Sequence, residues 1–418
     1  MSQITSLPDL SVTAEPADVG FDADRLRRID RHFRHYVDDG WLPGWLIAVM
    51  RHGELVHLAR SGHADVENDV PVADDTVWRM YSMTKPITTV AAMRLWEEGA
   101  FELNDPVGRY LPAFAEQRVW RSGSVTNHVT DPVTEVMRIW HLMTHTSGLT
   151  YGFLYAHPVD ELYRRAGFEW STPPGDDLAT AIDRLATLPL LFQPGTEWNY
   201  STATDVLGRL VEVLTGEPLD VALRRLVLAP LGMDETAFHA DESLVDRLAA
   251  LYMPHPGTRK ATRFDAFGEG AKHPPAAFQG GGGLVSTARD YLRFAEMLRR
   301  GGELDGIRLL SPRTVEYMAS NHLPGNADLS AFGRPLFAET TFDGVGFGLG
   351  VSVTIDPVTA KVPGSVGDHG WGGAASTFFW VDPVEDLTVL FLTQLMPSST
   401  HPIRSQLKQL VHQALVDA

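Results

Sequence analysis

The segment Ser82-Met83-Thr84-Lys85-Pro86 combines a candidate nucleophile with the start of a helix. Apolar residues at helical spacing follow it until Gly99, so the pattern predicts a helix over residues 82–98. Pro86 in the first turn fits a helix that begins here. Lys85 follows Ser82 by three residues, and residues at this spacing share one face of a helix. We therefore expect the amine of Lys85 to approach the hydroxyl of Ser82.

This arrangement has a chemical meaning for acyl transfer. A serine hydroxyl is a weak nucleophile until a neighbouring base takes its proton. A lysine can be that base only when neutral, which burial or nearby positive charge promotes. The helix N-terminus would also leave the backbone N–H of Ser82 free to face the oxyanion of a tetrahedral intermediate. Taken alone, a capping serine followed by a solvated lysine explains the same pattern.

Two distant segments supply groups that such a serine would need. Tyr200-Ser201-Thr202 follows a turn at Gln193-Pro194-Gly195, and a tyrosine near a lysine can act as general base and then as general acid. Gly370-Trp371-Gly372-Gly373-Ala374-Ala375 enters a predicted strand, where glycines allow close approach of a ligand. The N–H of Ala374 is then a candidate second oxyanion donor. The alternatives are a half-buried tyrosine and a tight turn with a packed tryptophan.

Four segments, in their order and spacing, resemble the family VIII carboxylesterases, which are bacterial esterases with the class C β-lactamase fold. They are Ser82-Met83-Thr84-Lys85-Pro86, Leu142-Met143-Thr144-His145-Thr146-Ser147-Gly148-Leu149, Tyr200-Ser201-Thr202 and Trp371-Gly372-Gly373. The similarity runs over most of the chain and extends to a glycine loop at Gly280-Gly281-Gly282-Gly283-Leu284. By this resemblance the chain is identified as a serine hydrolase of the penicillin-binding-protein and class C β-lactamase superfamily.

The resemblance implies a role for each matching residue. Ser82 would be the acylated nucleophile, and Lys85 and Tyr200 would transfer its proton. The backbone N–H groups of Ser82 and Ala374 would form the oxyanion hole. A mechanism of this kind requires no metal and no organic cofactor.

The third motif departs from the β-lactamase pattern. Class C β-lactamases have Lys-Thr-Gly where this chain has Trp371-Gly372-Gly373, and that lysine helps to bind a substrate carboxylate. The second motif ends in Thr202, where many β-lactamases have asparagine. Both changes favour neutral esters, with Trp371, Gly372 and Gly373 lining the pocket for the acyl or alcohol group. His369, just before this motif, is a further candidate that faces either the pocket or solvent.

The sequence thus predicts a serine esterase that hydrolyses short-chain carboxylic esters through an acyl-enzyme on Ser82. The preference for short acyl groups comes from the resemblance. The alternatives on the same scaffold are a β-lactamase, a D-amino-acid peptidase or amidase, and an acyltransferase that delivers the acyl group to an alcohol. A non-catalytic penicillin-binding sensor is disfavoured by the intact Ser82, Lys85 and Tyr200.

Composition limits the partners. A net charge of −18 argues against a nucleic-acid or anionic-membrane surface. The absence of cysteine excludes disulfides, Cys-ligated zinc and a thiol nucleophile. The N-terminus does not resemble a secretory signal, and no apolar run approaches the ~20 residues of a membrane span. We expect a cytoplasmic protein that binds a small-molecule ester; the sequence does not indicate its oligomeric state.

The predicted elements give an α+β fold with an antiparallel sheet built from both ends of the chain. They are an initial helix capped by Asp22, with Leu26, Ile29, Phe33 and Val37 on one stripe; a hairpin of 45–50 and 55–59; strands at 351–355, 376–381 and 387–393; and a final helix over 403–415. Residues 15–90 and 211–418 would form a discontinuous α/β domain. Residues 91–210 would form a mainly helical insertion, with the active site at the interface.

Other chemistry-bearing residues have simpler explanations. His141 and His145 have metal-ligand spacing, but no glutamate base lies between them, which favours core packing. No Gly-x-Ser-x-Gly elbow occurs, which counts against an α/β-hydrolase. A group of aromatic residues could line the pocket, although core or surface positions are the commoner outcome: Trp41, Trp45, Tyr151, Phe153 and Tyr155.

Overall fold

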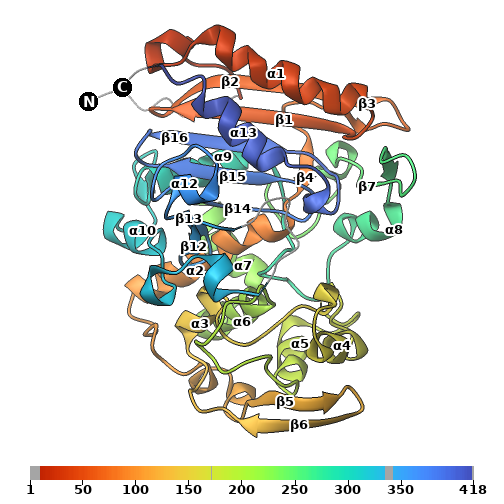
Figure 1. Cartoon of the computed structure of the whole chain (residues 1–418), viewed down its shortest axis with the longest axis vertical. Helices are drawn as coiled ribbons and strands as arrows, with labels where there is room; N and C mark the ends of the chain where they lie inside the picture. The colour runs from red at the N-terminus through yellow and green to blue at the C-terminus, as the bar shows by residue number, and fades with distance from the viewer. Residues whose placement is uncertain (1–9, 171, 335–341, 417–418) are drawn as a thin grey trace.

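An eight-stranded antiparallel sheet takes its strands from both ends of the chain (Figure 1). The computed structural model describes residues 10–170, 172–334 and 342–416. In spatial order the strands are β12 (Val345–Phe347), β13 (Ser352–Thr354), β14 (His369–Gly372), β15 (Phe378–Asp382), β16 (Leu387–Leu392), β1 (Gly44–Arg51), β2 (Glu54–Asp65) and β3 (Val70–Pro71). β1 pairs with β16 along its length, so the predicted α+β fold and the sheet built from both chain ends are confirmed.

Helices cover both faces of the sheet. The four longest in these layers are α1 (Ala23–Asp38), α2 (Thr84–Glu97), α9 (Ala288–Arg299) and α13 (Ile403–His412). α1 and α13 share one hydrophobic core with Ile47 and Val49 of β1. α2 and α9 share the opposite core with Leu46 and Ala48. Successive side chains of a strand point to opposite faces, and every residue of β1 is buried, which explains its continuous apolar run from Trp45 to Met50.

The first helix confirms the predicted cap and stripe with one change. The carboxylate of Asp22 accepts a hydrogen bond from the Arg25 N–H (2.9 Å), which satisfies one of the free donors at the helix start. The buried residues are Leu26, Ile29, Phe33 and Tyr36. Tyr36 therefore replaces the predicted Val37, because spacings of three, four and three residues keep the stripe on one face.

The predicted hairpin is also present. β1 and β2 are joined by His52 and Gly53, whose φ values are 55° and 82°. Two positive φ angles in a two-residue loop are what a type I′ turn requires. β2 continues to Asp65, beyond the predicted end at residue 59, because Gly44 of β1 still pairs with Gly62.

The middle of the chain lies beneath the sheet in Figure 1 and contains more than helices. Its helices are α3 (Ile139–Met143), α4 (Pro158–Arg165), α5 (Leu178–Leu185), α6 (Ala203–Thr215) and α7 (Leu219–Leu223). An antiparallel hairpin, β5 (Arg118–Ser124) with β6 (Asn127–Pro132), occupies a part that was expected to be helix or loop. Its strands are largely exposed, so the apolar alternation that marks a half-buried strand is weak there.

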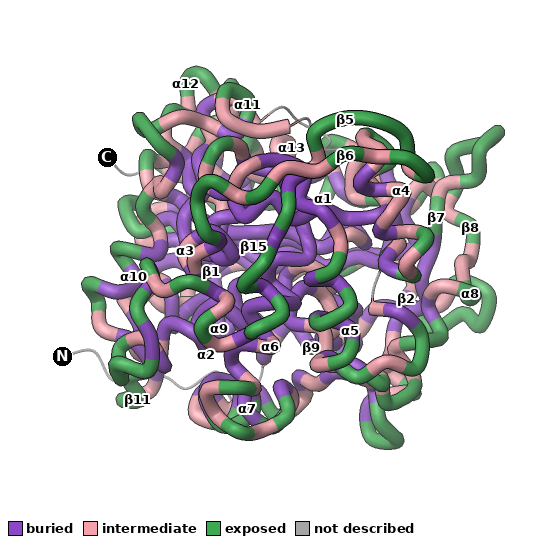
Figure 2. The backbone as a smooth tube through the Cα atoms, turned by 90° about the horizontal axis from the view of Figure 1, so that it is seen from below, coloured by how far each residue is buried: buried purple, intermediate pink, exposed green. Residues whose placement is uncertain are grey.

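The predicted domain division stays a prediction. α2 and α6 lie across the boundaries at residues 90 and 210 and contact each other. A single hydrophobic core includes residues of both portions, and in Figure 2 the buried backbone forms the centre of the molecule. Residues 335–341 and 417–418 of the second portion lie outside the described residues.

The third sequence motif forms a strand of its own, which corrects the expectation that its glycines begin the following strand. Residues His369–Gly372 are β14, an interior strand between β13 and β15. Trp371 pairs with Phe379 and Gly372 with Phe378. Ladder hydrogen bonds on both sides outweigh the low strand propensity of glycine.

Short elements complete the chain. They are β4 (Val77–Arg79), β7 (Tyr252–Pro254), β8 (Ala261–Arg263), α8 (Asp265–Gly268), β9 (Val285–Thr287), β10 (Glu303–Leu304), β11 (Ile307–Arg308), α10 (Pro312–Met318), α11 (Leu329–Phe332) and α12 (Pro357–Ala360).

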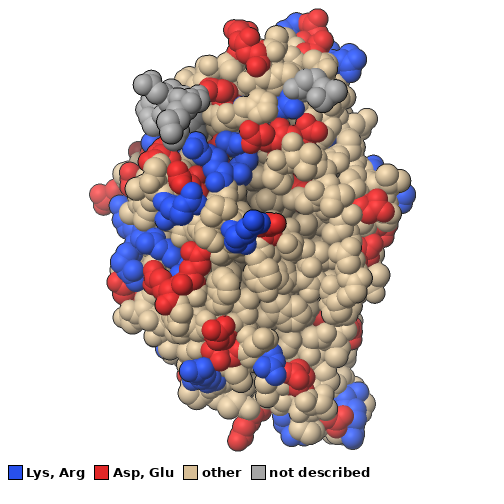
Figure 3. Space-filling view, turned by 90° about the vertical axis from the view of Figure 1, so that its left-hand side faces the viewer, with Lys and Arg blue, Asp and Glu red and all other residues tan. Residues whose placement is uncertain are grey.

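Within the described ranges, no helix has the length and apolar character needed to cross a bilayer. On the face drawn in Figure 3, basic and acidic side chains are interspersed, rather than gathered into a basic stripe.

Candidate active site

Ser82 lies in a single 3-10 turn, Tyr81–Met83, that leads directly into α2. The α-helix thus begins two residues later than predicted, and Ser82 precedes it. Tyr81 has a φ of 46°, a left-handed conformation that costs a non-glycine residue roughly 1–2 kcal/mol. The Met80 N–H donates to Leu284 O (2.9 Å) and the Met83 N–H to Met80 O (3.1 Å). These bonds hold the strained turn, a feature found most often at functional sites.

Lys85 is 1% exposed and points back to Ser82. Its Nζ donates hydrogen bonds to Ser82 Oγ (3.2 Å), Tyr151 Oη (3.0 Å) and Gly281 O (2.6 Å). These three oxygen atoms fix the position of the amine beside the Ser82 hydroxyl. The structure therefore brings Lys85 to the Ser82 hydroxyl, as their spacing predicts.

Tyr200 lies beside this pair without a hydrogen bond to either member. Lys85 Nζ is 4.6 Å from the centroid of the Tyr200 ring. The Tyr200 hydroxyl accepts a hydrogen bond from Trp371 Nε1 (3.3 Å). Within the part of the chain that the structure describes, no hydrogen bond joins this hydroxyl to Lys85 or Ser82. Its place as proton-transfer partner stays a prediction.

Tyr151, rather than the predicted Tyr200, is the tyrosine that is hydrogen-bonded to the Lys85 amine. Its ring lies 5.3 Å from that of Tyr200. Burial, together with the charge of Asp205 and the neighbouring Tyr200, holds the pKa of Tyr151 well above its usual value. The hydroxyl therefore stays protonated at neutral pH. No spacing rule connects Tyr151 to Ser82, so its contact with Lys85 could not be read from the sequence.

Asp205 is a site residue that the sequence did not single out. Its Oδ1 accepts the N–H of Gly281 (2.8 Å), and the carbonyl of the same glycine accepts from Lys85. A Cβ on Gly281 would approach the Asp205 carboxylate to 2.9 Å, so only glycine allows this approach. Burial raises the pKa of Asp205, while Lys85 and the Gly281 N–H oppose that rise.

The third motif, Trp371-Gly372-Gly373, forms another part of the cavity wall. A Cβ on Gly373 would overlap Met80 O, and one on Gly372 would overlap the guanidinium of Arg404 in α13. Ala374 follows in the turn between β14 and β15, where Gly373 N–H donates to Thr377 O (2.7 Å). Ala374 and Ser82 line the same cavity, and their pairing as oxyanion donors stays a prediction. Arg404 was not predicted as a site residue. It places a cation on the cavity lining even though this chain has Trp371 where class C β-lactamases have a lysine.

Three histidines have hydrogen-bond partners other than Ser82 and Lys85. The His369 ring is buried, its Nδ1 lies 3.0 Å from Gly367 O, and it does not line the cavity; the structure thus does not bring it to the site. His145 Nδ1 lies 3.0 Å from Ser201 Oγ, not from Ser82. Burial, with Lys85 adding to it, keeps the pKa of His145 well below its usual value. Burial also lowers the pKa of His141 to about 4. Both rings are therefore neutral core residues.

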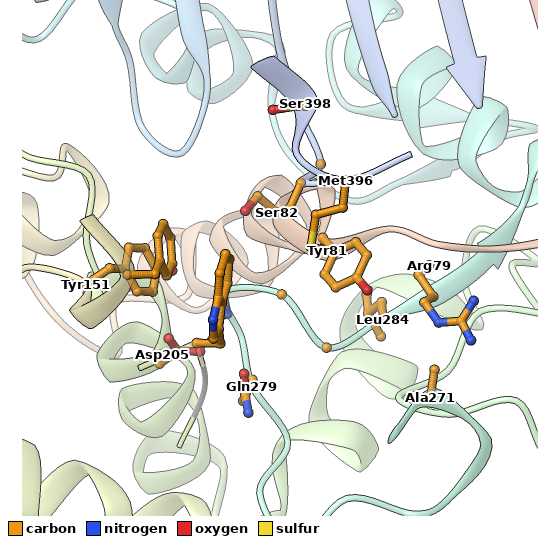
Figure 4. Close-up of a pocket in the computed structure, with 18 of the residues that line it drawn as sticks. Arg79, Tyr81, Ser82, Tyr151, Asp205, Ala271, Gln279, Leu284, Met396 and Ser398 are labelled. Carbon is orange, nitrogen blue, oxygen red and sulfur yellow. The ribbon is translucent and has the colours of Figure 1, made fainter. Parts of the chain in front are cut away.

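One cavity of about 380 Å³ connects these groups. Of the predicted residues, the following line the cavity: Ser82, Tyr151, Phe153, Tyr200, Trp371, Gly372, Gly373 and Ala374. Figure 4 shows Ser82 between Tyr151 on one side and Tyr81 on the other, with Asp205 below. Lys85 lies behind this surface. Among the residues that the structure describes, no cluster of three or more His, Cys, Asp or Glu could hold a metal ion.

Known proteins share this fold and the length of the chain. Esterase EstB of Burkholderia gladioli is 34% identical over 402 residues, which are 92% of this chain and 94% of EstB. Protein Rv1367c of Mycobacterium tuberculosis is 38% identical over 368 residues, 87% of this chain and 88% of that protein. The structure of EstCE1, a hydrolase with promiscuous acyltransferase activity, has a TM-score of 0.77 and 29% identity, covering 94% of this chain and 98% of EstCE1.

A protein-family model also matches the chain over most of its length. The model described as Beta-lactamase matches residues 29–413, which include Ser82, Lys85, Tyr200 and Trp371. The match begins within α1 and ends just after α13, so it spans the whole sheet and the cavity. The chain therefore belongs to the Beta-lactamase family of serine hydrolases.

Proposed function

We propose that this serine hydrolase is a carboxylesterase that cleaves esters with short acyl groups through an acyl-enzyme on Ser82. The observation that carries the proposal is the hydrogen bond between Lys85 Nζ and Ser82 Oγ inside a cavity walled by glycines and aromatic rings. The similarity to EstB over nearly the whole chain supports ester hydrolysis in particular.

In the first half-reaction, Ser82 Oγ attacks the carbonyl carbon while its proton passes to the Lys85 and Tyr200 pair. The N–H groups of Ser82 and Ala374 stabilise the oxyanion that forms. The bond between the carbonyl carbon and the alcohol oxygen then breaks, and the alcohol leaves with the transferred proton. The acyl group remains on Ser82.

In the second half-reaction, water attacks the acyl-enzyme, its proton passes to the same pair, and Ser82 regains its hydrogen as the acid leaves. Each step needs Lys85 to exchange a proton with Ser82 Oγ. The bonds of Lys85 to Tyr151 and Gly281 keep its amine at that position throughout. Asp205 holds Gly281 in turn.

Turnover of p-nitrophenyl acetate and butyrate tests the proposal. The parent protein should hydrolyse both esters, and Ser82→Ala should lose the activity while keeping its thermal transition and circular dichroism. Undiminished hydrolysis by Ser82→Ala would end the assignment. Nitrocefin measured in parallel distinguishes a β-lactamase: turnover of nitrocefin above that of the esters would favour that alternative, for which Arg404 provides a cation near Gly372.

Acyl transfer to an alcohol is a second candidate, favoured by the likeness to EstCE1, a hydrolase with promiscuous acyltransferase activity. Both reactions share the acyl-enzyme and differ in whether water or an alcohol attacks it. Adding a primary alcohol to a p-nitrophenyl butyrate assay separates them, because transfer yields the new ester in place of butyrate. Product analysis that finds only butyrate would eliminate this candidate.

A further inference from the structure

Five aromatic side chains form a continuous arc, called here the aromatic arc, along the wall of the cavity. Their ring centroids step from Tyr151 to Phe153 (4.7 Å), to Trp170 (4.5 Å), to Phe267 (5.3 Å) and to Tyr81 (6.5 Å). All five line the cavity. Both ends of the arc adjoin the nucleophile, since Tyr151 shares the Lys85 amine with Ser82 and Tyr81 precedes Ser82 in the chain.

The rings are ordered by contacts with one another. Tyr151, Phe153 and Trp170 are stacked with interplanar angles of 23° and 14°. Phe267, from α8, meets Trp170 edge to face at 74° and is stacked on Phe264 behind it. The arc is thus a preformed wall assembled from segments far apart in the sequence, and preformed walls reduce the entropy lost when a ligand binds.

The outer part of this wall remains open. Trp170 is 41% exposed even though two neighbouring rings contact it. A tryptophan with only a packing role would be more fully covered, because burying its ring removes a large apolar surface from water. The rings of the arc carry no charge. Of the charged side chains on the cavity lining, Asp205 and Arg404 lie elsewhere, and the guanidinium of Arg79, near Tyr81, is bonded to the Gly268 carbonyl.

We propose that the aromatic arc is the recognition surface for an aromatic ring of the substrate, so that the preferred substrates are short-acyl esters of aryl alcohols. The proposal rests on the proposed esterase function, which places the short acyl group on Ser82 and leaves the ring to the alcohol. Cavities of about 300–1,000 Å³ suit ligands of drug size. At about 380 Å³, this cavity is larger than an acetate of a small alcohol needs.

Three acetates that differ only in the alcohol test the proposal: ethyl acetate, 2-naphthyl acetate and decahydro-2-naphthyl acetate, followed by proton release. Comparing each variant with the parent on the same ester cancels differences in intrinsic reactivity. Trp170→Ala should lower kcat/KM for 2-naphthyl acetate about tenfold, because it removes a stacked ring and its buried area. The same change should alter kcat/KM for ethyl acetate by less than about twofold, and Trp170→Phe should restore most of the loss.

Tyr317→Ala is the matched control. Tyr317 is 42% exposed and stacked on Trp96 at 6.3 Å and 19°, as Trp170 is stacked on Phe153, but it does not line the cavity. It should leave all three rates unchanged.

Each other outcome overturns a defined part of the proposal. Equal losses by Trp170→Ala on all three acetates would show a structural role for the arc and leave the esterase assignment intact. Equal losses on the naphthyl and decahydronaphthyl esters alone would show selection for apolar bulk rather than for an aromatic ring. Failure of the parent to hydrolyse any of these esters would instead reject the proposed function itself.

Discussion

Replacing either of the two tyrosines beside Lys85 by phenylalanine separates proton transfer from support of the lysine. Tyr151→Phe removes one of the three acceptors of the Lys85 amine. Leaving a buried hydrogen-bonding group without its partner costs about 1–3 kcal/mol, so the variant should lose that much free energy of unfolding. A hydrogen bond of equal strength in the free enzyme and in the transition state does not change the rate when it is removed, so kcat/KM should fall by less than about tenfold.

Tyr200→Phe should behave in the opposite way. The Tyr200 hydroxyl has a hydrogen bond of 3.3 Å to Trp371 Nε1 and none to Lys85 within the described chain, so its loss should cost about 1 kcal/mol or less in stability. Proton transfer by a positioned side chain contributes about 10²- to 10⁴-fold to rate. The variant should therefore fold normally and lose at least about 100-fold in kcat/KM.

Paired measurements of kcat/KM on p-nitrophenyl butyrate and of the free energy of unfolding in urea distinguish these cases. In both variants the ring remains, so the aromatic packing between the two tyrosines is kept. The reasoning is refuted if Tyr200→Phe stays within tenfold of the parent while Tyr151→Phe loses more than about 10³-fold. That result would assign proton transfer to Tyr151.

Three further changes test the supports of the site. Asp205→Ala should lower the free energy of unfolding by about 1–3 kcal/mol, because it leaves the buried Gly281 N–H without its acceptor. Asp205→Asn should lower it less in the same urea titration, since an amide oxygen still accepts the hydrogen bond. Equal losses in the two variants would contradict this explanation. Gly373→Ala should destabilise the protein by about 1–3 kcal/mol, because the added Cβ would overlap the backbone oxygen of Met80. Gly372→Ala should cost less, because its Cβ would meet the end of the flexible Arg404 side chain; equal losses in the two variants would count against this explanation. Burial raises the pKa of Asp290 to about 6 from 3.8, so the native state binds this proton more tightly than the unfolded state. Stability should fall by up to about 3 kcal/mol between pH 4 and pH 6, and Asp290→Asn should remove that fall; an unchanged pH profile in the variant would assign the dependence to other groups.

The fold could be predicted where one residue's neighbours in sequence decide its structure. Asp22 caps α1, the His52-Gly53 pair turns the first hairpin, and alternation or continuous apolarity marks the strands. Prediction failed where tertiary pairing decided the outcome. β14 contains two glycines yet is a central strand, and β5 and β6 are too exposed to show a strand pattern.

The site divides in the same way. Ser82 and Lys85 are close in sequence, so helical geometry brings them together without further knowledge. Tyr151 bonds Lys85 directly and Asp205 bonds it through Gly281, in each case only because distant segments meet in the fold. No spacing rule anticipates such contacts. Arg404 belongs to the last helix and lies close to Gly372, the last residue of β14. The tryptophan at position 371, in place of a lysine, therefore did not indicate that a cation lines the cavity.

The central claim is that Ser82 forms the covalent acyl-enzyme. Incubation of the full chain with a fluorophosphonate, followed by peptide mass spectrometry, tests it most directly. We predict one adduct, located on the peptide that contains Ser82, together with loss of p-nitrophenyl butyrate hydrolysis and no adduct in Ser82→Ala. An adduct on another serine such as Ser201, or loss of activity with Ser82 unmodified, would contradict the account.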